Sequence, residues 1–244
     1  MIGITFALSS ESSDLVRRLQ AVQSHDNLIA GKIDPPSPNR QSGSDLRRAG
    51  NHEVTIVHTG VGARNCNERL EALLHKTRPR LVISSGFAGA VSEQLHIGDL
   101  ILAENFSDPG LLVMAERVLS KQARRVKLFT STSIIDSVAE RNEIARASGA
   151  EAVDMETGAI VAVCNAHGVP LLSLRAISDT PGEPFPAPPS VLFDLENQRT
   201  NFGRLLVYLL KNPAAIWRLF RFSRQIARVR ATLTDAIVAL VRSL

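Results

Sequence analysis

The stretch from Ala152 to Thr180 is the feature that most restricts how this chain can fold. It begins with two acids flanking a methionine, Asp154-Met155-Glu156, and continues through small and apolar residues that predict a helix. A Gly-Val-Pro turn then leads into an apolar segment, 171–177, that predicts a buried strand ending on Ser178-Asp179. Ligands of open α/β sheets bind beyond the carboxyl ends of the strands. We therefore expect the three acids to converge on one small polar molecule.

Strand-like and helix-like segments alternate along most of the remaining chain. The predicted strands are 2–8, 27–33, 54–58, 80–84, 100–102 and 128–133, and the predicted helices are 14–22, 66–74 and 137–148, the last lying on the surface. Residues 34–50 are rich in turn-forming types and predict a hairpin loop, whereas 109–127 has little pattern and is expected to be partly mobile or at an interface. The alternation predicts an α/β fold with a largely parallel sheet.

The C-terminal segment differs from the rest in charge and composition. A proline-rich loop follows Asp179, so we expect a catalytic domain in residues 1–190 and a helical extension in 191–244. Residues 201–244 have eight basic residues and one acid, which leaves residues 1–200 with a net charge of −3. The sequence pI of about 9.5 therefore reflects the extension, and it does not indicate a nucleic-acid partner.

Apolar residues recur every three or four positions in this extension, beside a separate basic face. The apolar stripe is Phe222, Ile226, Val229, Leu233, Ile237 and Leu240, and the basic face is Arg218, Arg221, Arg224 and Arg228. In one interpretation the helix packs on the domain or on a sister subunit, with the arginines in solvent. In the other it contacts anionic lipid or a lipid substrate.

Several classes of protein are disfavoured by what the sequence lacks. It starts without a secretory signal pattern and has no apolar run long enough to span a membrane, so we expect a cytoplasmic protein, with contact to the inner membrane surface as an alternative. Cys66 and Cys164 predict buried thiols. The histidines show no paired ligand spacing, and serine-nucleophile and phosphate-loop motifs are absent; we expect neither a metal nor a cofactor.

Two glycine-containing turns and one early acid have both a structural and a functional interpretation. The turn 59–65 links a predicted strand to a helix and could bind an anion or hydroxyl, or could be only a tight turn around Gly60. The segment 85–90, with Gly86 and Phe87, places small residues where a backbone can approach a ligand. From its position alone, Glu11 is expected to be a solvent-exposed acid in the first turn of a helix, where the helix dipole stabilises it.

Taken together, these segments resemble the purine nucleoside phosphorylase/uridine phosphorylase family. The resemblance is nearest to the branch that hydrolyses methylthioadenosine and S-adenosylhomocysteine. The matching segments occur in family order and are 2–4 with Glu11 beyond them, 58–62, 85–90, 97–100, 153–157 and 175–179. The resemblance implies a single three-layer αβα domain around a mostly parallel mixed sheet, a small-molecule nucleoside as substrate, and a homodimer or higher homo-oligomer.

The resemblance also implies roles for individual residues. Asp179 would donate a proton to N7 of the purine, for which a desolvated pocket would have to raise its pKa, and Glu11 would activate the attacking water. Glu156 would accept hydrogen bonds from the ribose hydroxyls, with Met155 packed against the sugar. The backbone at Ile134 and Ile135 would lie near the base. The other residues expected in the substrate pocket are Asp154, Ser178, Phe87, Gly86 and Gly60.

The nucleophile depends on whether a phosphate site exists. Where purine phosphorylases have an arginine and a phosphate-binding serine, this chain has Ser84 and Phe87, which favours water. Arginines 40, 47 or 48 of a neighbouring subunit are the alternative that would allow phosphorolysis.

The expected function is therefore hydrolysis of the N-glycosidic bond of a purine nucleoside, with adenine the expected base, releasing the free base. Three alternatives stay open. One is a phosphate-dependent phosphorylase, and one is a degenerate subunit that only binds nucleosides. The third is cleavage of an adenosylated lipid, because the basic extension resembles the hopanoid-associated branch of the family.

Overall fold

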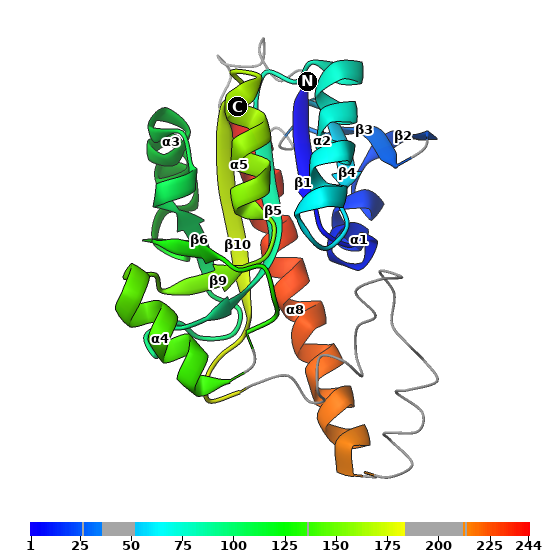
Figure 1. Ribbon diagram of the computed structural model, residues 1–244. Coiled ribbons are helices and arrows are strands. Elements are labelled where there is room, and N and C mark those ends of the chain that lie inside the picture. Colours follow the sequence, from blue (N-terminus) through cyan, green and yellow to red (C-terminus); the bar gives the residue numbers. More distant parts are fainter. Residues whose placement is uncertain (26, 36–51, 136, 184–211, 213) are drawn as a thin grey trace.

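The computed structural model describes residues 1–25, 27–35, 52–135, 137–183, 212 and 214–244. Within them, ten strands form one sheet in the order β2-β3-β4-β1-β5-β10-β6-β7, with β9 pairing with β5 and β8 (Figure 1). Almost all of the predicted hairpin loop, and the predicted boundary near residue 190, lie outside the described residues. The strands are β1 Ile2–Phe6, β2 Gln20–His25, β3 Leu28–Ile33, β4 His52–His58, β5 Val82–Ala90, β6 Leu100–Ala103, β7 Ala123–Val126, β8 Leu128–Thr130, β9 Ala152–Asp154 and β10 Leu171–Asp179.

The centre of the sheet is parallel and its margins are mixed. Strand β1 pairs in parallel with β4 and β5, and β5 pairs in parallel with β10. Strands β3 and β6 join this centre antiparallel, and β9 pairs antiparallel with the end of β5. The predicted α/β fold with a mostly parallel mixed sheet is therefore confirmed.

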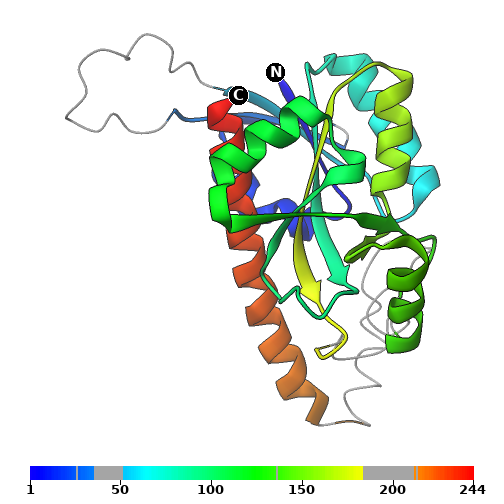
Figure 2. The same ribbon diagram turned by 90° about the vertical axis from the view of Figure 1, so that its left-hand side faces the viewer.

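Helices cover both faces of the sheet, as the three-layer prediction requires (Figures 1 and 2). The helices are α1 Ser9–Arg17, α2 Ala63–Thr77, α3 Pro109–Leu119, α4 Val138–Ser148, α5 Thr157–Ala166 and α8 Ala214–Ser243, with short 3₁₀ turns at Glu104–Phe106 and Ser120–Gln122. Helices α2 and α5 pack together on one face, where Cys66 and Cys164 are both buried, as predicted. Helices α1, α3 and α8 cover the other face.

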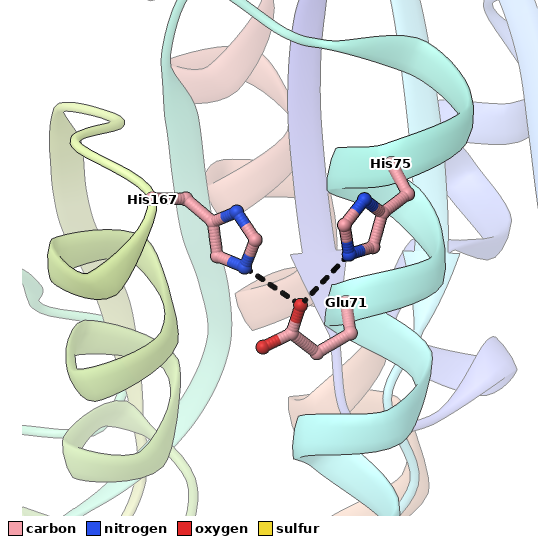
Figure 3. Close-up of side chains that lie close together, drawn as sticks. All are labelled: Glu71, His75 and His167. Carbon is pink, nitrogen blue, oxygen red and sulfur yellow. Dashed lines mark hydrogen bonds and ion pairs between the residues drawn. The ribbon is translucent and has the colours of Figure 1, made fainter.

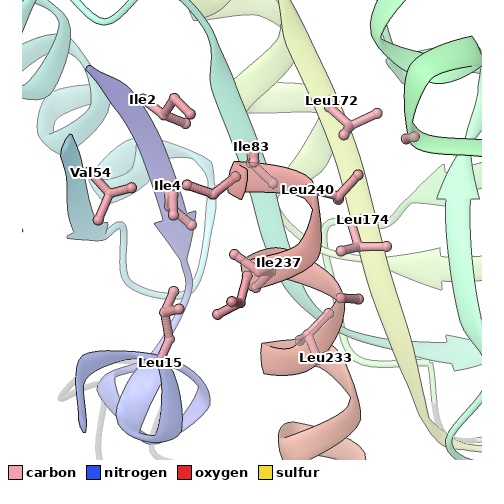
Figure 4. Packing of buried hydrophobic residues seen from close by; sticks show 14 of the residues in the cluster. Ile2, Ile4, Leu15, Val54, Ile83, Leu172, Leu174, Leu233, Ile237 and Leu240 are labelled. Atoms are coloured by element: carbon pink, nitrogen blue, oxygen red, sulfur yellow. The ribbon is translucent and has the colours of Figure 1, made fainter. Parts of the chain in front are cut away.

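The C-terminal half of α8 belongs to the main hydrophobic core. Leu233, Ile237 and Leu240 are at most 1% exposed and pack against the strand residues Ile4 and Leu174 (Figure 4). This is the packing on the domain that the first interpretation of the stripe expects. The N-terminal half of α8 continues beyond the edge of the sheet (Figures 1 and 2). No helix among the described residues is long and apolar enough to cross a membrane.

Two local predictions were wrong, and both errors have a physical reason. The helix expected over 14–22 ends at Arg17, and residues 20–25 instead form β2, which pairs with β3. Residues 20–25 form a hairpin with β3, in which His25 pairs with Leu28, and this pairing outweighs the helical spacing of the apolar residues. The poorly patterned segment 109–127 contains α3, which is capped by Asp108 accepting hydrogen bonds from the N–H groups of Gly110 and Leu111. An Asp-Pro start is a helix signal that the apolar periodicity missed.

Candidate active site

A cavity of about 360 Å³ opens at the carboxyl ends of β1, β5 and β10. Helix α1 begins beside it, as does α5 after β9, so both acid-bearing segments reach it. The residues that line it are Ala7, Leu8, Ser10, Glu11, Val61, Phe87, Ala88, Gly89, Ser133, Ile134, Ile135, Arg141, Val153, Asp154, Met155, Glu156, Ser178, Asp179, Phe222 and Ile226. The predicted convergence of the acids at one sheet edge is therefore present.

Glu11 is turned inward, in contrast to the solvated helix-start acid that its position alone suggested. Its side chain is 7% exposed and accepts hydrogen bonds from the backbone N–H groups of Leu8 at 2.9 Å and Phe87 at 3.2 Å. Burial raises the pKa of Glu11 above its ordinary value, although the N–H donors and the charge of Arg175 oppose this shift. A methyl group on Gly86 would lie 3.1 Å from the Glu11 carboxylate, so the absence of a side chain at Gly86 leaves room for that carboxylate.

Asp154 is held by a buried polar network. Its carboxylate forms an ion pair with Arg175 at 3.1 Å and accepts hydrogen bonds from the hydroxyls of Thr130 and Thr157. Arg175 also donates to Ser84 Oγ at 2.8 Å and to Thr157 Oγ1 at 2.7 Å. Both Asp154 oxygens are thus occupied by protein donors, and the network joins β5, β8, β10 and α5.

Glu156 lies between the two other acids of the cluster. Burial, together with the charges of Asp154 and Glu11, raises the pKa of Glu156 to about 8. Arg175 and the backbone N–H of Gly62 oppose the shift without cancelling it. With a pKa of about 8, Glu156 is mostly protonated at neutral pH, so its carboxyl group can both donate and accept a hydrogen bond in the cavity.

Asp179 is 2% exposed and faces a counter-charge that the sequence did not predict. Arg141 of α4 forms an ion pair with Asp179 and donates to the carbonyl oxygens of Ala90 at 2.6 Å and Ile135 at 3.1 Å. Ser178 Oγ donates to the other Asp179 oxygen at 2.7 Å. Helix α4 was expected to be a surface helix, yet Arg141 on it is only 1% exposed. A methyl group on Gly89 would lie 3.0 Å from an Asp179 carboxylate oxygen and 3.2 Å from an Arg141 guanidinium nitrogen, so a larger residue here would displace the pair.

A second, much smaller cavity of about 10 Å³, called the extension below, shares Glu11, Phe87 and Glu156 with the first. It is lined by Glu11, Glu156, Arg175, Ser85 and Gly86, among others. The buried Ser85 hydroxyl has no hydrogen-bond partner among the described residues. A polar space of this size is adequate for about one water molecule, which Ser85 and the acids could hold.

Most of the predicted site residues line the cavity, with two exceptions. Gly86 lines the small extension instead, and Gly60 lies in the turn between β4 and α2, where its neighbour Val61 reaches the cavity. The sequence analysis missed Arg141, the role of Arg175, and Phe222 and Ile226 of α8. Arg175 was visible beside Asp179 in a matching segment, whereas nothing in 137–148 distinguishes Arg141 from its exposed neighbours.

The fold and this acid-lined cavity define an α/β protein whose pocket suits a small polar molecule. Comparison with known families shows a match to the phosphorylase superfamily over residues 45–114 and 106–211. The chain belongs to this superfamily, which confirms the predicted family.

Individual relatives are nucleosidases. The 5′-methylthioadenosine/S-adenosylhomocysteine nucleosidase of Staphylococcus haemolyticus is 27% identical over 212 residues, covering 73% of this chain and 86% of that protein. The structure of the corresponding Streptococcus pneumoniae enzyme with 8-aminoadenine has a TM-score of 0.72 at 20% identity, covering 100% of this chain and 99% of that one. Futalosine hydrolase of Helicobacter pylori has a similar fold, with a TM-score of 0.68 at 17% identity, covering 100% of this chain and 97% of that one.

The raised pKa of Glu156 makes stability depend on pH. Between its ordinary value of 4.5 and about 8, the folded state binds a proton that the unfolded state releases, so the free energy of unfolding falls as pH rises through this window. Glu156→Gln removes the titrating group, so the free energy of unfolding of the variant should not fall in this way. Between pH 5 and pH 8, we expect the free energy of unfolding of the variant to rise relative to that of wild type by about 1–3 kcal/mol, measured by urea unfolding. The exposed control Glu93→Gln should show no such trend, and a parallel pH dependence for Glu156→Gln and wild type would contradict the expectation.

Proposed function

We propose that this protein hydrolyses the N-glycosidic bond of a purine nucleoside and releases the free base, with adenine as the favoured base. The observation that supports this most is the placement of Glu11, Glu156 and Asp179 around one cavity. Cleavage of this bond leaves positive charge on the ribose and negative charge on the base. Glu11, Glu156 and the Asp179–Arg141 pair all line the cavity, so it offers acidic groups for both the ribose and the leaving base.

In the proposed reaction, the base lies against Ser178, Asp179 and the Ile134–Ile135 backbone, and the ribose lies against Met155 and Glu156. As the bond between the ribose carbon and the base nitrogen breaks, protonated Asp179 transfers its proton to N7 of the leaving base. Water in the extension attacks the ribose carbon, and Glu11 accepts its proton. The products are free base and free ribose, and one water is consumed.

Water is favoured over phosphate as the nucleophile, because the cations of the site are already paired with acids. Among the described residues that line the cavity and its extension, the cationic side chains are Arg141 and Arg175, and both are engaged with acids. Ser84, which stands where phosphorylases have an arginine, is uncharged, and its hydroxyl accepts a hydrogen bond from Arg175. Arginines 40, 47 and 48 lie outside the described residues.

Product analysis tests this function. With adenosine, methylthioadenosine and inosine, we expect free base and free sugar without added phosphate, the sugar being ribose or, from methylthioadenosine, methylthioribose. Glu11→Gln and Asp179→Asn should each lower kcat by about 100-fold or more, because each removes a proton-transfer group. The control Glu93→Gln should leave kcat unchanged. A sugar 1-phosphate formed only with phosphate would show a phosphorylase, and nucleoside binding without turnover would show the degenerate binding subunit.

Arg141 is a positioning residue in this mechanism. Its guanidinium forms an ion pair with the Asp179 carboxyl group and is itself fixed by the carbonyl oxygens of Ala90 and Ile135. Arg141 therefore fixes the direction in which the Asp179 carboxyl group faces the cavity and the leaving base.

Changing Arg141 should lower the rate of the chemical step more than it weakens substrate binding. In Arg141→Met we expect kcat to fall with little change in KM, because the Asp179 carboxyl group loses its orientation toward the leaving base. Arg141→Lys, which keeps a cation beside Asp179, should restore part of kcat. Arg146→Met, on an exposed part of the same helix, is the control. An unchanged kcat in Arg141→Met, or a loss that Arg141→Lys does not restore in part, would contradict the positioning role.

A second candidate substrate is an adenosylated lipid presented at an anionic membrane surface. Phe222 and Ile226 of α8 line the cavity. One turn earlier, Trp217 and Phe220 are 77% and 54% exposed, and the guanidinium of Arg224 lies 5.7 Å from the Phe220 ring centroid. Exposed aromatics beside arginines, on the helix that also lines the cavity, are typical of an interfacial helix. They would bring the cavity close to a lipid surface.

Vesicle binding tests this second candidate. The protein should bind vesicles of phosphatidylglycerol mixed with phosphatidylcholine, and not phosphatidylcholine alone. Trp217→Ala combined with Phe220→Ala should weaken binding about 10-fold or more and leave turnover of soluble adenosine intact. Val113→Ala, which changes an exposed apolar residue on α3, is the control. Equal binding by the double variant and wild type would contradict the lipid surface.

The homo-oligomer and the cytoplasmic location stay predictions. Light scattering coupled to size-exclusion chromatography measures the first directly.

A further inference from the structure

Two histidines and a glutamate meet on the face of α2 and α5, outside the residues that line the cavity (Figure 3). Glu71 and His75 lie one turn apart on α2, and His167 is the C-cap residue of α5. Glu71 and His167 are 96 positions apart in the chain. Packing of α2 against α5 is what brings the three together, so the histidine spacing in the sequence could not predict it.

The ligand atoms converge on one point. The Glu71 Oε2 atom is 2.7 Å from His167 Nε2 and 3.5 Å from His75 Nε2, and the three ligand atoms lie within 4.8 Å of one another. Zinc bonds of 2.0–2.1 Å in a tetrahedral site place neighbouring ligand atoms about 3.4 Å apart. Small rotations of these three side chains are therefore enough to surround one ion.

The surroundings also favour a cation. His75 lies in the last turn of α2, and His167 ends α5, so the negative ends of two helix dipoles face the cluster. The side chains of His75, Glu71 and His167 are 73%, 41% and 29% exposed. One side of the cluster thus faces solvent, from which water can supply a fourth ligand.

We propose that Glu71, His75 and His167 form a binding site for a divalent transition-metal ion, best suited to Zn²⁺. Two imidazoles and a carboxylate are a ligand set that zinc accepts. The ion joins the C-terminal ends of α2 and α5. The N-terminal ends of the same helices hold Gly62 and Glu156 beside the cavity, about 20 Å away along α2. The metal therefore has a structural role, and the proposal is independent of the reaction proposed above.

Titration of the full-length protein with Zn²⁺ tests the site. Isothermal titration calorimetry of protein cleared with a chelator should show one ion bound per chain. His75→Ala and His167→Ala should each weaken that binding at least 10-fold, and Glu71→Gln should weaken it as well. His96→Ala is the matched control, because His96 is exposed and belongs to a different part of the surface. Zinc should also raise the melting temperature of wild type, and not of His167→Ala.

Two outcomes would overturn the proposal. One is the absence of zinc binding at micromolar concentrations. The other is binding that persists unchanged in both His75→Ala and His167→Ala, which would place the ion elsewhere. Because the test measures binding and melting, its result does not depend on whether the protein hydrolyses nucleosides.

Discussion

The buried ion pair between Arg175 and Asp154 is the interaction on which the rest of the site depends. It places a cation between acids that would otherwise repel one another, and it links the strands and helix that carry them. Burying a charge without a partner costs several kcal/mol, so each member requires the other. With Asp154 committed to Arg175 and Thr157, Glu11 and Glu156 are left to face the cavity. Their raised pKa values follow from the same burial.

A second buried ion pair, Arg141 with Asp179, contributes to the same cavity. The two guanidiniums have different partners: Arg175 pairs with Asp154 beside Glu11 and Glu156, whereas Arg141 pairs with Asp179 alone. Each buried pair holds its acid in a fixed position, and two further acids, Glu11 and Glu156, line the same cavity. This convergence of acids is the physical basis for proposing cleavage of a bond whose two halves take opposite charge.

Helix α8 shows how one apolar stripe can serve two surfaces. Its C-terminal part completes the core over the sheet, and its next members, Phe222 and Ile226, close a wall of the cavity. The stripe was read correctly from its spacing. Its division between core and cavity depends on where the sheet ends, which periodicity does not encode. The mistaken helix over 14–22 has a more local cause, since residues 20–25 form a hairpin with the next strand, β3.

The sequence by itself determined the fold class and the acids that meet at the cavity. Strand-end acids such as Asp179, and the Asp154–Glu156 pair before a helix, are local patterns whose direction follows from the sheet. Only the tertiary structure decided the partners: Arg141 for Asp179, Arg175 for Asp154, and His167 for Glu71 and His75. The reason is physical. A strand end or a helix start is specified by neighbouring residues, whereas the contact of two distant side chains depends on how whole helices and strands pack.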